Sequence, residues 1–136
     1  MRPRIVSKFL KMKPDVQISH VAACRSRSVA VSNDSGDVYE WGYLGNDRGA
    51  ESQFEVSLTL PSKLKHVEAG LNFNLYLMED GKVFVSGEIY QDGETIMNTF
   101  NYGDGKKLVN LTDSLPDDVN IVSIKCGYSH ALLLDD

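Results

Sequence analysis

Residues 75–87 read Leu-Tyr-Leu-Met-Glu-Asp-Gly-Lys-Val-Phe-Val-Ser-Gly. Two runs rich in apolar, β-branched and aromatic residues flank Asp80-Gly81, and an Asp-Gly pair between such runs is a strong signal of a β-hairpin. A type I′ turn needs positive φ, which Gly and Asp tolerate best. The stretch therefore predicts two antiparallel strands, 75–78 and 82–87, that are joined by a turn at Glu79–Gly81.

The same pattern occurs three times along the chain, beginning at Val21, Val67 and Ile124. In each copy a short polar step leads into an apolar run, and in the first two copies a turn and a further strand follow. The interval from the second copy to the third is longer than the interval from the first to the second. The extra length falls in 88–114, and an insertion confined to one place per repeat is typical of a loop on one face.

Repeating antiparallel units of this length indicate the blades of a β-propeller. We expect an all-β fold of antiparallel β-propeller blades, with about two full blades plus a partial one, which is an incomplete propeller. The first repeat covers 16–63, the second covers 64–116 with a long loop at 88–114, and the partial third covers 117–136. Residues 1–15 are a basic segment and a candidate for the outer strand of a preceding blade. Because an uncovered edge strand promotes aggregation, we expect a piece of a propeller or a subunit that another chain completes.

The basic charge of the chain is concentrated at its start. Residues 1–13 hold five of the 14 basic residues and no acidic residue. Three alternatives fit this segment: a short strand with a solvated loop, an amphipathic mitochondrial targeting segment, or an arm that contacts nucleic acid or lipid. We expect a cytoplasmic or nuclear protein, with a mitochondrial location as the alternative.

The composition is that of one ordinary globular domain. The chain has 136 residues, of which 42% are hydrophobic and 24% are charged. Its formal net charge of −5 disfavours a chain-wide nucleic-acid interface, so no direct nucleic-acid binding is expected. No apolar run approaches the roughly 18 residues of a membrane-spanning helix, so no membrane span is expected. Two cysteines are too few for a disulfide framework, which favours a reducing compartment.

No sequence pattern predicts catalysis. Cys24 and Cys126 lie near opposite ends of the chain and are expected to be buried free thiols. The three histidines lack the spacing of metal ligands, and the acidic residues fall in stretches that read as solvated turns. We therefore expect no enzyme activity, no cofactor and no metal site.

Seven residues are predicted to be structural. Crowding near a propeller axis favours glycine, because the backbones approach closely there. The alternative is that these glycines are simply turn residues. The single histidine of the set is expected to make a hydrogen bond inside its own blade. The set comprises Trp41, Gly42, Gly70, Gly81, Gly87, Gly127 and His130.

Three stretches, Gly36–Gly42, Asp80–Gly87 and Ile124–Leu134, resemble the repeat of the regulator of chromosome condensation family. In that repeat a Gly, two variable residues and a His precede alternating apolar residues. An Asp-Gly turn, an apolar strand and Trp-Gly follow. The resemblance covers residues 16–136 and is divergent and partial, because the family histidine is present only at His130.

The resemblance implies a seven-bladed β-propeller in complete members and a range of functions. Some members are nucleotide exchange factors for a small GTPase and dock on nucleosomes. Others are interaction domains in ubiquitin ligases or ciliary proteins, or are mitochondrial assembly factors. Here Arg27 and Phe73 stand at the places of the family histidine, and the Gly-Gln-Leu-Gly loop motif is absent after Gly42 and Gly87. Because proteins with this one repeat have such different functions, the fold does not fix the function.

We expect a noncatalytic protein-interaction scaffold built from these repeats. The alternatives are a guanine-nucleotide exchange regulator of a small GTPase and a mitochondrial assembly factor. The expected partner is a protein, either a chain that completes the propeller or a small GTPase. Loops on a rigid scaffold often carry function, and their apolar side chains serve as anchors or alternatively pack between blades. The candidate contacts, in loops 43–60 and 88–114, are Tyr43, Leu44, Phe54, Ile89, Tyr90, Ile96, Phe100 and Tyr102.

Overall fold

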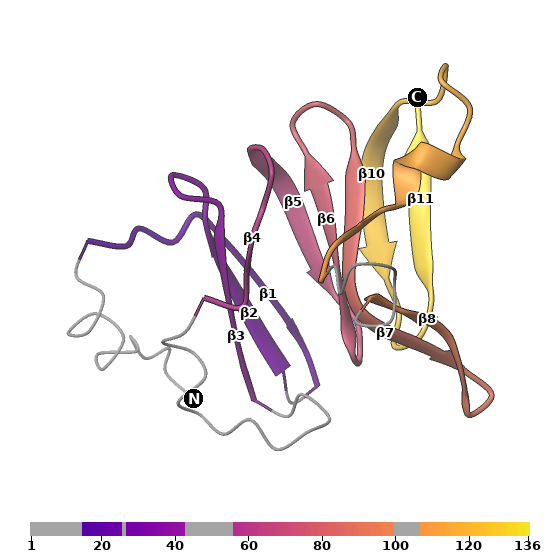
Figure 1. The fold of residues 1–136 in the computed structure, drawn as a ribbon, viewed down its shortest axis with the longest axis horizontal. Helices are drawn as coiled ribbons and strands as arrows, with labels where there is room; N and C mark the ends of the chain where they lie inside the picture. Colours follow the sequence, from indigo (N-terminus) through magenta and orange to yellow (C-terminus); the bar gives the residue numbers. More distant parts are fainter. Residues whose placement is uncertain (1–14, 26, 43–55, 100–106) are drawn as a thin grey trace.

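The computed structural model describes residues 15–25, 27–42, 56–99 and 107–136. Their strands form three antiparallel sheets that stand side by side in chain order, from indigo to yellow in Figure 1. The predicted all-β fold of antiparallel blades is confirmed, and the three sheets have an open, propeller-like arrangement.

The first sheet has the strand order β1-β2-β3-β4. A hydrogen bond of 2.8 Å from the Gly36 N–H to the Ser32 carbonyl closes the turn between its two central strands. The valines of these central strands are buried and lie on one face of the sheet. The strands are β1 (His20–Cys24), β2 (Arg27–Ser32), β3 (Asp37–Gly42) and β4 (Leu58–Thr59).

The second sheet lies between the other two, and β6 is buried along its whole length. Its strands are β5 (Leu64–Ala69), β6 (Phe73–Met78), β7 (Val83–Gln91), β8 (Glu94–Asn98) and β9 (Val109–Asn110). The first half of β7 pairs with β6 and β9, and its second half pairs with β8. The expected turn joins β6 to β7, although of Asp80-Gly81 only Gly81 has positive φ, at 86°.

The third sheet is a hairpin of β10 (Ile121–Cys126) and β11 (Ala131–Asp135). A short 3-10 helix, Leu111–Ser114, lies on the path into it. The Asn110 side chain caps this helix, because its Oδ1 accepts a hydrogen bond of 3.0 Å from the Thr112 N–H.

The strand registers confirm the repeat read from the sequence. The first residue of each copy has a partner at the same place in its own sheet: Val21 pairs with Ala30, Val67 with Tyr76, and Ile124 with Leu133. From one sheet to the next, both strands of the pair are therefore displaced by the same number of residues, and this number equals the spacing of the copies in the sequence. Equivalent positions in the three sheets can be compared directly.

Two apolar clusters fill the spaces between the sheets. The first cluster joins Val29, Val31 and Val38 of the first sheet to residues of the second, which are Leu64, Val67, Tyr76 and Met78. The second cluster joins the opposite face of the second sheet to the third, through Phe73, Leu75, Leu77, Val83, Val85, Ile121 and Ile124. Because side chains alternate across a strand, β6 contributes Tyr76 and Met78 to one cluster and Leu75 and Leu77 to the other.

The stretch 88–114 differs from the predicted long loop in its described part. Residues 88–98 form a second hairpin, in which β7 continues to Gln91 and β8 returns. Asp92 and Gly93 make its turn with φ of 52° and 81°, the pair of positive values that a type I′ turn requires. The physical reason is the same Asp-Gly signal that marks the turn before β7.

Candidate protein-interaction site

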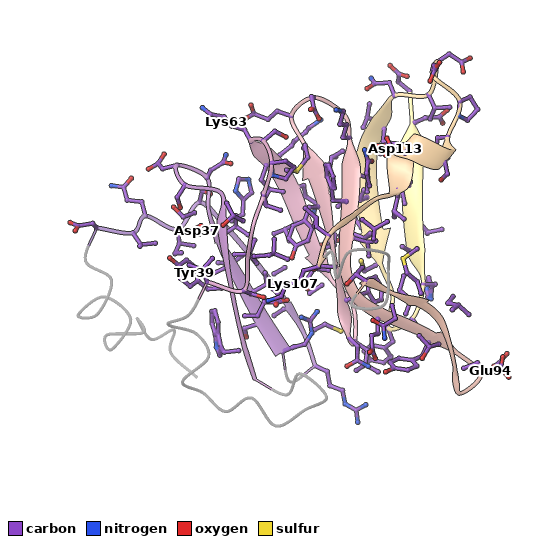
Figure 2. All side chains as sticks on the ribbon, in the orientation of Figure 1. Asp37, Tyr39, Lys63, Glu94, Lys107 and Asp113 are labelled. Atoms are coloured by element: carbon purple, nitrogen blue, oxygen red, sulfur yellow. The ribbon has the colours of Figure 1, made fainter. Side chains whose placement is uncertain are left out.

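The β7–β8 hairpin extends away from the sheets and is the described part of the predicted contact region (Figure 1). Figure 2 shows Glu94 near its far end. Residues 88–98 carry three acidic residues and no basic one. The hairpin therefore offers a negatively charged projection on the side of the second sheet.

A β-bulge decides which hairpin side chains face solvent. Ile89 pairs with Met97, but the next residue, Tyr90, pairs with Thr95, so Ile96 is an extra residue in β8. Bulges re-aim side chains, and Ile96 is 58% exposed, whereas Ile89 and Met97 pack against the second apolar cluster.

Hydrogen bonds hold the base of this hairpin. The Tyr90 hydroxyl donates to the Glu88 carboxylate, and the Asn98 side-chain amide donates to the same carboxylate over 2.8 Å. The Thr99 hydroxyl accepts a bond of 2.9 Å from the Gly87 N–H. These contacts and the packing of Ile89 fix the hairpin to the second sheet.

Of the eight predicted contact residues, three are described and only one is exposed. Ile96 faces solvent, Tyr90 is half-buried beside Glu88, and Ile89 packs against the core. The other five lie outside the described residues, namely Tyr43, Leu44, Phe54, Phe100 and Tyr102.

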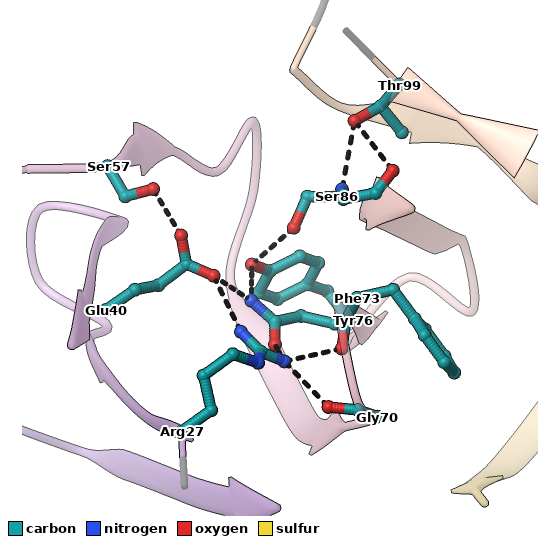
Figure 3. A network of polar contacts seen from close by, with 10 residues as sticks. Arg27, Glu40, Ser57, Gly70, Phe73, Tyr76, Ser86 and Thr99 are labelled. Carbon is teal, nitrogen blue, oxygen red and sulfur yellow. Dashed lines mark hydrogen bonds and ion pairs between the residues drawn. The ribbon is translucent and has the colours of Figure 1, made fainter. Parts of the chain in front are cut away.

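A buried polar network joins the first sheet to the second (Figure 3). Arg27, on β2, donates through Nη2 to the carbonyls of Gly70 at 3.0 Å and Phe73 at 2.7 Å, and to Asn74 Oδ1 at 2.6 Å. Its Nη1 lies 3.3 Å from Glu40 Oε1. A charged guanidinium in this position is stabilised by the carboxylate and by backbone oxygens together.

The network continues into the second sheet through neutral groups. Asn74 donates to Glu40 and, over 3.0 Å, to the Tyr76 hydroxyl, which shares a 3.0 Å hydrogen bond with Ser86. Burial raises the pKa of Tyr76, and the negative charge of Glu40 adds to the effect. The phenol therefore stays protonated at neutral pH and acts as a hydrogen-bonding partner rather than as an acid or base.

Cys24 and Cys126 are free, half-buried thiols. Burial raises the pKa of Cys126 to about 12, and the charges of Glu68 and Cys24 act in the same direction. A thiol with this pKa is protonated at neutral pH and is a poor nucleophile or metal ligand. In the described ranges, no group of three or more His, Cys, Asp or Glu is placed to hold a metal ion.

Two of the predicted structural glycines each lie under the ring of a nearby side chain. A Cβ built on Gly70 would lie 2.1 Å from the Phe73 ring, and one on Gly127 would lie 2.1 Å from the His130 imidazole. The imidazole of His130 is exposed and makes no hydrogen bond to any other described residue. The expected hydrogen bond inside its blade is thus not among the contacts of the described chain.

The remaining structural residues lie where the repeat places them. Gly42 pairs with Arg27 and Gly87 pairs with Phe73, at equivalent positions of β3 and β7. Trp41 is half-buried on β3, and Gly81 closes the turn before β7.

No helix in the described ranges has the length and hydropathy to cross a membrane.

No protein-family model and no curated protein matches this sequence. The fold, in contrast, is similar to solved β-propellers. Prp20p from Saccharomyces cerevisiae matches with a TM-score of 0.57 and 21% identity, over 89% of this chain and 29% of its own. Human WBSCR16 matches with the same TM-score and identity, over 89% of this chain and 32% of its own.

Yeast RCC1 (Prp20) bound to Kap60 matches with a TM-score of 0.56 and 20% identity, over 89% of this chain and 28% of its own. This chain thus spans less than a third of the length of each of these solved chains. The resemblance read from the sequence is confirmed at the level of the fold: the chain folds as a partial, divergent β-propeller of the regulator of chromosome condensation type.

Proposed function

We propose that this chain is a noncatalytic protein-interaction scaffold that contacts its partner through the β7–β8 hairpin. The observation that carries the proposal is the exposed Ile96 at a bulge on a firmly held hairpin. Large apolar side chains on rigid elements are the usual anchors of protein interfaces, because they bury area at low entropic cost.

The charge of the hairpin specifies the chemistry of the partner surface. Glu88, Asp92 and Glu94 surround the bulge, without a basic residue between 88 and 98. Complementary potentials steer association and exclude partners of like charge. We therefore propose a partner surface with an apolar pocket for Ile96 and basic residues at its rim.

The solved structures with this fold give further support for a protein partner. The structure of Prp20p is described together with its binding to Gsp1p and histones, and yeast RCC1 was solved bound to Kap60. These are two structures of one yeast protein, and this chain shares the fold of less than a third of it.

Affinity capture with matched variants tests the proposal. The full chain, an Ile96→Asp variant and a control Val56→Asp variant are used as baits, and bound proteins are identified by mass spectrometry. Val56 is also exposed, but it precedes β4 of the first sheet, whereas the hairpin belongs to the second sheet. We expect a partner that the wild type and the control retain and the Ile96→Asp variant loses. The same bound proteins on all three baits would refute the role of the hairpin.

A second candidate function is stimulation of nucleotide exchange on a small GTPase. Its support is the similarity in fold to Prp20p, which binds Gsp1p. Release of a fluorescent guanine nucleotide from the GTPase measures it directly. Unchanged release at micromolar chain concentrations would reject this candidate and leave the scaffold proposal intact.

For the compartment we propose the cytoplasm or nucleus, with mitochondrial import as the alternative. The alternative is supported by the excess of basic residues in 1–13. A fusion of these residues to a fluorescent reporter distinguishes the two, because only a targeting segment would carry the reporter into mitochondria.

A further inference from the structure

The third sheet exposes an apolar face that the other two sheets bury. Leu132 and Leu134 of β11 are 65% and 61% exposed. Their equivalents in the second sheet, Leu75 and Leu77, are at most 1% exposed, because the third sheet covers them. In the first sheet the equivalents are Val29 and Val31, which the second sheet covers to the same degree.

The first sheet exposes the kind of surface that packs against such an apolar face elsewhere in the chain. Ile18 and Val21 are 39% and 72% exposed. The equivalent residues of the second sheet, Leu64 and Val67, are buried against the first sheet. The equivalents in the third sheet are Ile121 and Ile124, and these are buried against the second sheet.

The contact between the first and second sheets and the contact between the second and third sheets therefore use the same two kinds of surface. The receiving surface is the pair Val29 and Val31, or its equivalent, and the entering surface is the pair Leu64 and Val67, or its equivalent. In the described chain one receiving surface and one entering surface remain uncovered. They lie on the third and first sheets, at opposite ends of the row in Figure 1.

We propose that the Ile18–Val21 face of one copy of this chain docks on the Leu132–Leu134 face of a second copy. The occupant is a second copy because the chain itself carries both complementary halves, at the positions that already pack together twice within it. The two faces are different, so the contact is head-to-tail and can continue from copy to copy. This assembly does not use Ile96 and is independent of the proposed function of the hairpin.

A polar group also matches this arrangement. His130 stands at the position of Arg27, whose guanidinium donates to backbone carbonyls of the next sheet. Its imidazole makes no hydrogen bond to another described residue, so a ring nitrogen is available to a docked sheet. Lys125 contacts Glu68, the residue at the equivalent position of the second sheet. The equivalent residue of the first sheet is the uncharged Ala22, so this position brings no like charges together in the docked pair.

Analytical ultracentrifugation of the full chain over a wide range of concentrations tests the proposal. We expect the average mass of the wild type to rise with concentration. A Val21→Asp variant and a Leu134→Asp variant should each stay monomeric, because each lacks one of the two faces. Both positions are exposed, so both variants should keep the circular dichroism spectrum of the wild type, and Val56→Asp is the control that should still associate.

The decisive sample is an equimolar mixture of the two variants. The Val21→Asp copy keeps an intact receiving face and the Leu134→Asp copy keeps an intact entering face, so the mixture should form a species of twice the monomer mass and nothing larger. Non-specific aggregation or a symmetric contact would not give this result. A wild type that stays monomeric throughout, or a mixture of variants that stays monomeric, would overturn the proposal.

Discussion

The ring of Phe73 stands where a side chain at Gly70 would have to be, and a Cβ built on that glycine would lie 2.1 Å from the ring. Phe73 is buried in the second apolar cluster and its carbonyl accepts hydrogen bonds from Gly70 and from Arg27. The same arrangement recurs between Gly127 and His130, but there the ring is exposed. The two pairs share a local geometry and differ in how far the ring can move.

A methyl group at each glycine separates these two cases. We expect Gly70→Ala to lower the free energy of unfolding by about 1–3 kcal/mol, because the buried ring cannot yield without disturbing the core. Gly127→Ala should cost less than about 1 kcal/mol, since the exposed imidazole can rotate away. Urea unfolding followed by circular dichroism measures both values. A loss at Gly70 as small as the one expected at Gly127 would show that Phe73 is free to move.

The buried pair of Arg27 and Glu40 gives a second prediction. Replacing Arg27 with Met removes the cation from a site where the carboxylate has little water around it, and we expect a loss of about 3 kcal/mol in stability. Adding Glu40→Gln should recover part of this loss, because the neutral glutamine amide does not need a nearby cation to balance it. The free energies of unfolding of the wild type, the two single variants and the double variant form the thermodynamic cycle that measures the coupling.

The pair of the exposed Lys125 and the half-buried Glu68 is the control for that cycle. Its atoms are 3.7 Å apart, and the lysine side chain faces water. Lys125→Met should change the free energy of unfolding by less than about 1 kcal/mol. If the losses at Arg27 and Lys125 were alike, the network in Figure 3 would not be what joins the two sheets.

The reactivity of Cys126 tests its environment. With a pKa of about 12, this thiol has almost no thiolate at pH 8. Burial, the largest cause, remains when Cys24 is replaced, so a Cys24→Ser variant should react slowly with iodoacetamide. The rate should keep rising well above pH 9.0, the ordinary pKa of a thiol, because burial in the folded protein raises the pKa of Cys126. The same variant in urea should react as an ordinary cysteine does. Fast alkylation of the folded variant at pH 8 would contradict the assigned burial.

The strands can be predicted because their signals are local. The Asp80-Gly81 turn and the runs around it lie within the single stretch 75–87, and the copies that begin at Val21 and Ile124 place the other sheets. The hairpin at Asp92-Gly93 carries the same signal, but it lies inside the insertion that the repeat pattern predicts to be a loop. Its detection needs only the same turn rule to be applied there.

The candidate site is harder to predict, because it depends on packing and register. Ile89 and Ile96 are both isoleucines of one hairpin, and only the bulge tells the buried side chain from the exposed one. The buried polar network is even harder to predict from the sequence, because Arg27 and Asn74 are 47 positions apart in the chain. Alternating apolar residues predict which strands form, but not which polar side chains two stacked sheets bring together.

The hairpin itself allows the last prediction. We expect Ile89→Ala to lower the free energy of unfolding by about 2 kcal/mol, because its side chain packs against the second apolar cluster. Ile96→Ala should change it by less than about 0.5 kcal/mol, because the bulge turns that side chain toward water. The two substitutions remove the same atoms from the same hairpin, so strand propensity cannot explain a difference between them. Thermal and urea unfolding of both variants give the comparison, and a larger loss at Ile96 than at Ile89 would mean that the register of β7 and β8 is shifted by one residue from the one described.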